Sequence, residues 1–171
     1  MPGCRHVDQP LALQLRERPR DGLDRETEIV GDVLPRHRQA LRLAAEKANW
    51  DKPLPAGHSR GLALHKSFGT TVAQVVEVSK QGQAPHKVEN VTCAVDCGVA
   101  VNPDVIAAQM EGGIGFGLSP ALMSEITFEK GKVVQSNFHD YSVIRMPQMP
   151  AVAVHIVPSN EHPTGVGEPA V

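Results

Sequence analysis

Apolar residues recur at helical spacing between residues 33 and 49, with arginines and a glutamate between them. The apolar positions are Leu34, Leu41, Ala44 and Ala48. One apolar stripe on an otherwise charged segment is the pattern of a helix that buries one face. We therefore predict a helix over residues 33–49 with Asp32 as its N-cap, followed by a loop at 52–61 that is rich in proline and glycine.

Segments rich in β-branched residues follow this loop. Residues 72–78 and 88–95 each contain several valines, and a turn region with glycine and proline lies between them at 82–85. This arrangement predicts two paired strands. Residues 151–157 predict a further strand by the same composition.

A second helix is predicted from Asp104 to about Ser124, after a loop at 96–103. Four glycines interrupt it, at positions 112, 113, 115 and 117, and each costs an isolated helix about 1 kcal/mol relative to alanine. Their concentration suggests that another surface approaches this backbone closely. Beyond the helix, residues 126–128 and 133–138 flank a charged tip and predict a hairpin. Strands mixed with two helices favour an α+β fold.

Composition narrows the class of function. At 171 residues with 41% hydrophobic content, the chain has the size of one ordinary domain. A net charge of -2 and an aromatic content of 4% argue against nucleic acid as a partner and favour a small organic substrate. Three cysteines do not make a disulfide scaffold, and the sequence shows no apolar run that predicts a transmembrane segment. Residues 1–31 lack a persistent apolar period, so we assign them to no domain and expect poor order.

The last residues of the chain carry the most informative candidate. Glu168 is the one carboxylate in an otherwise uncharged Gly-Val-Gly-Glu-Pro stretch at 165–169. The two glycines permit close contacts, and Pro169 restricts Glu168 to extended conformations. A positioned acid or base needs such restriction, although an exposed glutamate in a turn has the same pattern.

A second candidate is Gln109, which lies just before Gly112 and Gly113. Its amide can donate and accept hydrogen bonds beside a backbone left bare by glycine, as a cofactor would require. A glycine-rich packing helix with a polar edge is an equally good interpretation. Cys93 and Cys97 could ligate a metal only with partners that the sequence does not identify, and one or both are interpreted as small buried hydrophobic residues. The sequence contains no HExxH, GxSxG or P-loop motif.

The order of these motifs resembles the molybdenum-cofactor-binding large subunit of the xanthine dehydrogenase/aldehyde oxidase family. The resemblance rests on Cys-Ala-Val-Asp-Cys-Gly-Val-Ala-Val-Asn-Pro at 93–103, Gln-Met-Glu-Gly-Gly at 109–113, and Gly-Val-Gly-Glu-Pro at 165–169. Asn-Phe-His-Asp-Tyr at 137–141 is similar to the isoquinoline 1-oxidoreductase beta-subunit branch. The resemblance spans about residues 33–171, and we expect 32–171 to be a C-terminal part of the molybdopterin-binding domain, truncated at its end.

The resemblance implies a role for each candidate residue. Glu168 matches the glutamate that acts as general base, and Gln109 matches a glutamine that hydrogen-bonds the cofactor. Gly112, Gly113, Gly165 and Gly167 are the other expected cofactor-binding residues. The expected cofactor is molybdopterin with molybdenum, in its cytosine dinucleotide form, whose dithiolene holds the metal in this family, so no protein metal ligand is expected.

The resemblance also implies partners and a reaction. The expected reaction is oxidation of an N-heterocycle or an aldehyde with oxygen derived from water, and electrons leave through [2Fe-2S] clusters on a small partner subunit. Large subunits of the family are several times longer than this chain, so we expect the chain alone to be inactive. The alternative is a remnant that keeps the scaffold, binds no cofactor and has a structural or binding role.

Overall fold

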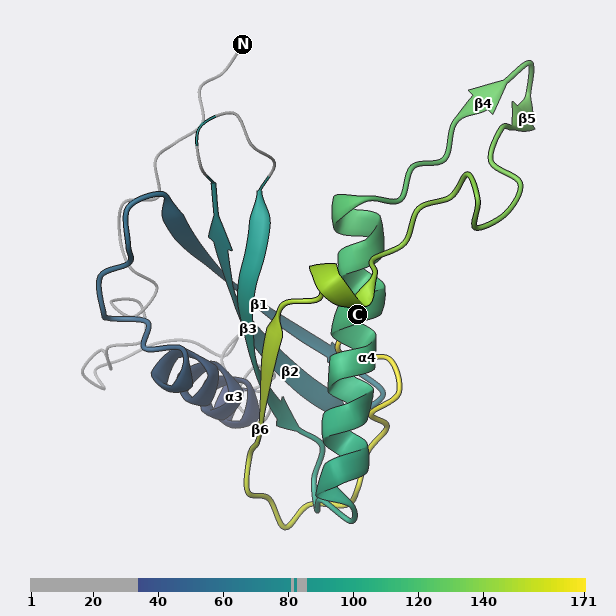
Figure 1. Ribbon diagram of the computed structural model, residues 1–171. Coiled ribbons are helices and arrows are strands. Elements are labelled where there is room, and N and C mark those ends of the chain that lie inside the picture. The colour runs from purple at the N-terminus through teal and green to yellow at the C-terminus, as the bar shows by residue number, and fades with distance from the viewer. Residues whose placement is uncertain (1–33, 81, 83–85) are drawn as a thin grey trace, which may run out of the picture.

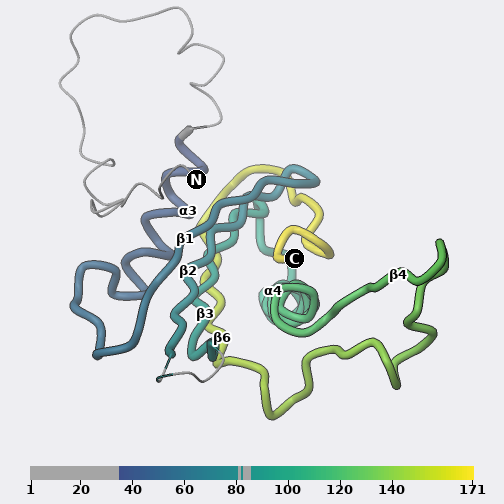
Figure 2. The backbone as a smooth tube through the Cα atoms, turned by 90° about the horizontal axis from the view of Figure 1, so that it is seen from above, coloured from purple at the N-terminus to yellow at the C-terminus, as the bar shows by residue number. Residues whose placement is uncertain are grey.

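The computed structural model describes residues 34–80, 82 and 86–171. A four-stranded sheet forms its centre, in the order β1-β2-β3-β6. The strands are β1 (His58–Ser67), β2 (Thr70–Ser79), β3 (Lys87–Asp96) and β6 (Ala151–Ile156). Strand β2 pairs antiparallel with both β1 and β3, and β6 pairs with β3 in parallel. One helix lies on each face of this sheet (Figures 1 and 2), so the α+β prediction is confirmed.

Helix α3 (Leu34–Lys47) covers one face of the sheet. Ala40 and Ala44 are fully buried and pack with Ala73, Val75 and Ala94. Small side chains on both sides let the helix backbone approach the strands closely. The prediction of a helix at 33–49 is confirmed, with its end two residues earlier, while the predicted cap lies outside the described residues.

Helix α4 (Pro103–Leu122) covers the opposite face, and the prediction of a helix from Asp104 to about Ser124 is confirmed. The Asn102 side chain accepts a hydrogen bond from the Val105 amide, and Pro103 occupies the first turn, which together explain where the helix starts. Met110 and Ile114 pack into the main apolar cluster. The surface that approaches Gly113 and Gly117 is formed by the C-terminal residues of the chain, whereas Met149 approaches Gly115. An added Cβ on Gly113 would lie 3.0 Å from the Ala170 side chain, and one on Gly117 would lie 3.0 Å from the Val171 carbonyl carbon.

Strand β1 corrects the predicted loop at 52–61, because the structure begins a strand at His58. Ten residues of β1 pair in register with β2, from His58 opposite Ser79 to Ser67 opposite Thr70. The sequence did not indicate this strand because it is a half-exposed edge with Gly61 and Lys66 inside it. Phe68 and Gly69, both at positive φ, make the tight turn into β2.

The predicted hairpin is present but short. It consists of β4 (Phe128–Glu129) and β5 (Lys132–Val133), and it projects from the body in Figure 1. The predicted strand at 133–138 is wrong beyond Val133, because the Asp140 carboxylate accepts hydrogen bonds from the amides of Ser136 and Asn137. These local bonds replace a strand ladder. The chain returns through a 3-10 turn (Met146–Gln148) to β6, where the predicted strand is confirmed.

Within the described residues, no helix combines the length and the hydropathy that crossing a membrane requires.

Candidate functional site

A pocket of about 700 Å³ lies on the α4 side of the sheet. Three parts of the chain form it: the end of β1 with its turn, the middle of α4, and the C-terminal segment. The lining residues are His65, Ser67, Phe68, Gln109, Gly112, Gly113, Phe116, Gly167, Glu168 and Val171. The pocket thus joins segments that are far apart in the sequence, and Figure 2 shows the C-terminal segment beside α4.

Five of the six site residues expected from sequence line this one pocket. Gln109, Gly112 and Gly113 come from α4, and Gly167 and Glu168 come from the C-terminal segment. The sixth, Gly165, lies behind the pocket wall: a Cβ there would be 3.0 Å from the Phe68 Cβ. Its lack of a side chain therefore makes room for Phe68.

The backbone around Glu168 is anchored while its side chain is exposed. Gln74 on β2 donates from Nε2 to the Ala170 carbonyl oxygen at 2.9 Å, and the Val171 amide donates to the Glu168 carbonyl oxygen at 3.0 Å. Pro169 and Ala170 are buried under this anchor. A carboxylate on a fixed backbone at the edge of a pocket has a restricted reach, as a proton acceptor requires.

The wall that α4 presents is bare at Gly112. No atom lies within 4 Å of an added Cβ at this position, although the same construction at Gly113 meets Ala170. Gln109, one turn earlier, is exposed and lines the same pocket. A flat, polar ligand could contact the helix backbone at Gly112 and bond the Gln109 amide. The donor set and the bare wall therefore fit a pterin-type cofactor.

Sequence reasoning missed five lining residues: His65, Ser67, Phe68, Phe116 and Val171. The first three went unnoticed because residues 62–71, between the predicted loop and the predicted strand at 72–78, were assigned to no element. The signal that could have found them is Phe68-Gly69, a two-residue turn between alternating segments. Phe68 is 66% exposed and Phe116 is 69% exposed, so two aromatic rings flank a pocket that also contains a carboxylate.

A buried ion pair lies at the end of β3. Arg36 on α3 donates from Nε and Nη2 to the two carboxylate oxygens of Asp96, each at 2.6 Å, and Asp96 is 1% exposed. Burial alone would raise the pKa of Asp96, but hydrogen bonds from Arg36 and from the Gly98 amide outweigh it and hold the pKa below its usual range. Asp96 is therefore a buried anion with a specific partner.

Cys93 and Cys97 are both buried thiols. Burial raises the pKa of Cys93 to about 12 and also raises the pKa of Cys97. Both side chains belong to the apolar cluster under α4, where a protonated thiol packs as a small hydrophobic group. Among the described residues, no three His, Cys, Asp or Glu side chains lie together in a way that could hold a metal ion.

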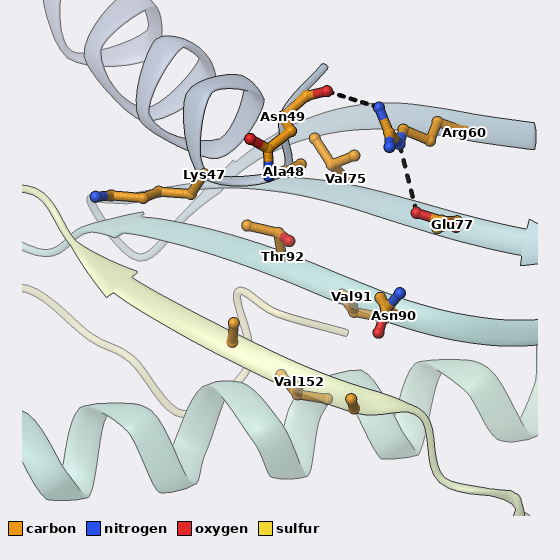
Figure 3. A pocket seen from close by; sticks show the side chains of 12 residues that line it. Lys47, Ala48, Asn49, Arg60, Val75, Glu77, Asn90, Val91, Thr92 and Val152 are labelled. Carbon is orange, nitrogen blue, oxygen red and sulfur yellow. Dashed lines mark hydrogen bonds and ion pairs between the residues drawn. The ribbon is translucent and has the colours of Figure 1, made fainter. Parts of the chain in front are cut away.

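A second pocket, of about 290 Å³, lies near the end of α3 on the other face of the sheet (Figure 3). Arg60 crosses it and donates from Nη1 to the Asn49 carbonyl oxygen at 2.8 Å, and its Nε lies 3.5 Å from Glu77. His58 bonds the other oxygen of Glu77 at 2.8 Å. These charged groups already have partners, so they tie the loop after α3 to the sheet. None of the predicted site residues lines this pocket.

Sequence comparison with known proteins points to the same family as the motifs do. Over 138 residues the chain is 39% identical to isoquinoline 1-oxidoreductase subunit beta of Brevundimonas diminuta, covering 78% of this chain and 18% of that protein. It is 33% identical over 148 residues to the membrane-bound aldehyde dehydrogenase (pyrroloquinoline-quinone) of Gluconacetobacter polyoxogenes, covering 82% of this chain and 19% of that protein. The chain thus spans less than a fifth of the length of these curated relatives.

Comparison of structures supports the fold. CO dehydrogenase of Oligotropha carboxidovorans matches with a TM-score of 0.54 at 24% identity, over 59% of this chain and 13% of the other. The model of the molybdopterin cofactor-binding domain matches residues 28–150, which include Gln109, Gly112 and Gly113 and end before Glu168. The pocket joins those residues to the carboxylate of Glu168, and the family match covers most of the chain. The chain therefore belongs to the molybdopterin cofactor-binding domain family of the xanthine dehydrogenase type.

Proposed function

We propose that this chain forms one wall of the cofactor and substrate site of a molybdenum hydroxylase that oxidises an N-heterocycle or an aldehyde with oxygen from water. The observation that carries the proposal is the shared pocket, in which Gln109 and Gly112 on α4 face the same space as Glu168. Relatives named for isoquinoline and for an aldehyde as substrates support the two substrate classes.

The cofactor we propose is molybdopterin in its cytosine dinucleotide form. Gln109 would hydrogen-bond it, and Gly112 would let it lie against the helix backbone. Gly113 and Gly167 would form adjacent parts of the wall, and Gly165 would act indirectly, by seating Phe68. When bound, the molybdenum centre supplies the two-electron oxidation that no protein side chain here can perform.

Glu168 is the proposed general base. Its backbone is fixed from both sides, so its carboxylate can take a proton from the group that delivers oxygen to the substrate. Phe68 and Phe116 flank the same pocket and would exclude water from it once a substrate is present. Exclusion of water strengthens the electrostatic interactions of a charged base with its surroundings.

A redox partner completes the proposal. Electrons taken from the substrate must leave the site, and [2Fe-2S] clusters are held by sets of cysteines. The chain has three cysteines in all, of which Cys93 and Cys97 are buried in the apolar cluster. We therefore place the clusters on a separate small subunit, in line with a relative that is itself named as one subunit of its enzyme.

The test is a chimera, because the chain spans 18% of its relative's length. Residues 28–171 replace the matching segment of the Brevundimonas diminuta subunit, which is expressed with its partner and assayed with isoquinoline. In this chimera Glu168→Gln should lower turnover by about 10² to 10⁴-fold, the usual contribution of a general base. The molybdenum content per protein should stay unchanged.

The matched control is Glu125→Gln, an exposed glutamate at the start of the projecting hairpin. It should leave both turnover and molybdenum content unchanged. Unchanged turnover in Glu168→Gln would refute the role of Glu168. A chimera that folds but holds no molybdenum would instead favour the structural remnant.

A further inference from the structure

The ion pair between Arg36 and Asp96 joins helix α3 to the end of strand β3. Arg36 lies in the first turns of α3, and Asp96 is the last residue of β3. Both contacts are 2.6 Å long, and the two oxygens of the carboxylate each receive one donor. A bidentate pair of this kind is both stronger and more directional than a single charged contact. It fixes the end of β3 relative to α3.

Asp96 also organises the turn that follows it. Its Oδ1 accepts a hydrogen bond from the Gly98 amide at 3.3 Å, and Gly98 has a φ of +75°. A Cβ on Gly98 would lie 2.1 Å from the His162 carbonyl oxygen. The backbone of the C-terminal segment therefore packs directly against the turn at 96–98. Only glycine at position 98 permits this contact, because any side chain there would clash.

Three backbone hydrogen bonds seat that segment on the turn and its neighbours. The Val99 amide donates to the Glu161 carbonyl oxygen at 2.9 Å, and the Thr164 amide donates to the Cys97 carbonyl oxygen at 2.9 Å. The Gly165 amide donates to the Phe68 carbonyl oxygen at 3.2 Å. The segment is thus held on both sides of Thr164, and Glu168 follows a few residues later.

We propose that Arg36 and Asp96 are positioning residues for Glu168: their pair fixes the turn that seats residues 161–165, and this seat sets where the carboxylate meets the pocket. The action passes from α3, through the end of the sheet, to the α4 side. The role of Glu168 as a base rests on the proposed function, but the seating of the segment does not.

The test is hydrogen exchange of backbone amides in the 171-residue chain. Asp96→Asn replaces the carboxylate by a neutral group of the same shape, so no unpaired anion is left buried. We expect the amides of Val99, Thr164 and Gly165 to exchange at least about tenfold faster in this variant, since a hydrogen bond to a charged group is lost. Amides in the centre of the β2–β3 ladder should change by less than about twofold.

Arg36 provides the second set of variants. Arg36→Met should accelerate exchange at the same three amides, and the conservative Arg36→Lys should restore part of the protection because it keeps the charge. Lys87→Met is the matched control, since Lys87 makes an ion pair of the same 2.6 Å length with Glu89 on the same strand, but its side chain is 72% exposed. This control should leave the three amides unchanged.

Two results would overturn the inference. One is unchanged exchange at the three amides in Asp96→Asn. The other is an equal acceleration at every amide, which would make the pair a general stabiliser without a positioning role. Neither result depends on catalysis, whereas the proposed function fails separately, through unchanged turnover in Glu168→Gln.

Discussion

The two faces of the sheet are closed by helices in different ways. On the α3 face, Ala40 and Ala44 are completely buried against Ala73 and Ala94. On the α4 face, glycines admit the C-terminal residues of the chain and leave the helix backbone bare at Gly112. One face is filled by small side chains, and the other keeps an open pocket of about 700 Å³ beside its apolar cluster.

This difference between the two faces concerns where a ligand could bind. Alanine packs closely against alanine around Ala44, and in the smaller pocket near the end of α3 the side chains of Arg60 and Glu77 already have partners. Glycine in a helix costs stability, yet it exposes backbone that a ligand can touch. The α3 face is therefore closed around its helix, whereas the α4 face combines the main apolar cluster with the groups that can act on another molecule.

The largest effect on stability is expected from a larger side chain in the contact between α3 and the sheet. Ala44→Leu adds three carbons where no space exists, so we expect the free energy of unfolding to fall by about 1 to 3 kcal/mol. Trp50, the one tryptophan of the chain, packs against this cluster and reports unfolding in urea by its fluorescence. Binding at the α4 face should not change, because the sheet lies between the two sites.

Glu46→Leu is the control for this substitution, since it places the same side chain on an exposed position of the same helix. Its effect should stay within about 0.5 kcal/mol. Equal effects of the two substitutions would contradict a close alanine contact between α3 and the sheet.

An effect of comparable size, which builds up as pH rises, is expected at Cys93 on the α4 face. Burial raises the pKa of this thiol to about 12, whereas an unfolded cysteine ionises near 8.5. Between these values the unfolded chain loses a proton that the folded chain keeps, so stability falls as pH rises. The slope from Cys93 is about 1.4 kcal/mol per pH unit.

Urea unfolding between pH 8 and 10.5 measures this slope. Cys93→Ala should flatten it by the contribution of one thiol, whatever the change costs in packing. A slope that is equal in both proteins would show that the thiol ionises in the folded state, and thus that the α4 side of β3 is open to water.

The helices and the principal site residues could be predicted because each is encoded locally. Apolar periodicity gave α3, Asn102 and Pro103 mark the start of α4, and the glycine-flanked Glu168 is unusual by itself. The resemblance of the ordered motifs then placed Gln109 and Glu168 in one site. The pocket agrees with that grouping, although the catalytic and binding roles remain predictions.

Strand β1 could not be predicted, because its stability comes from pairing with β2 and not from its own composition. Its weak alternation and Gly61 hide an edge strand that becomes clear only from the full register with β2. The pocket residues that depend on it, His65, Ser67 and Phe68, were lost with it. Arg36 and Asp96 are 60 residues apart in the sequence, and no local sequence pattern predicts a contact between them.

The smallest change in stability, and the sharpest contrast between the faces, is expected at Gly112. Alanine there meets no atom within 4 Å, so the substitution should raise the free energy of unfolding by about 0.5 to 1 kcal/mol through helix propensity alone. Exposed Ala108→Gly in the same helix should lower it by a similar amount and serves as the control.

In the chimera the more stable of the two variants, Gly112→Ala, should bind less molybdenum than Ala108→Gly. Gly112→Ala places a methyl group where we propose that the cofactor lies against the backbone, so molybdenum bound per protein should fall by about tenfold or more. Ala108→Gly should keep its molybdenum despite its lower stability. If the Gly112→Ala variant is more stable and still binds a full complement of molybdenum, the cofactor does not touch the helix backbone at this position. Gly112 would then have no binding role that distinguishes the α4 face from the α3 face.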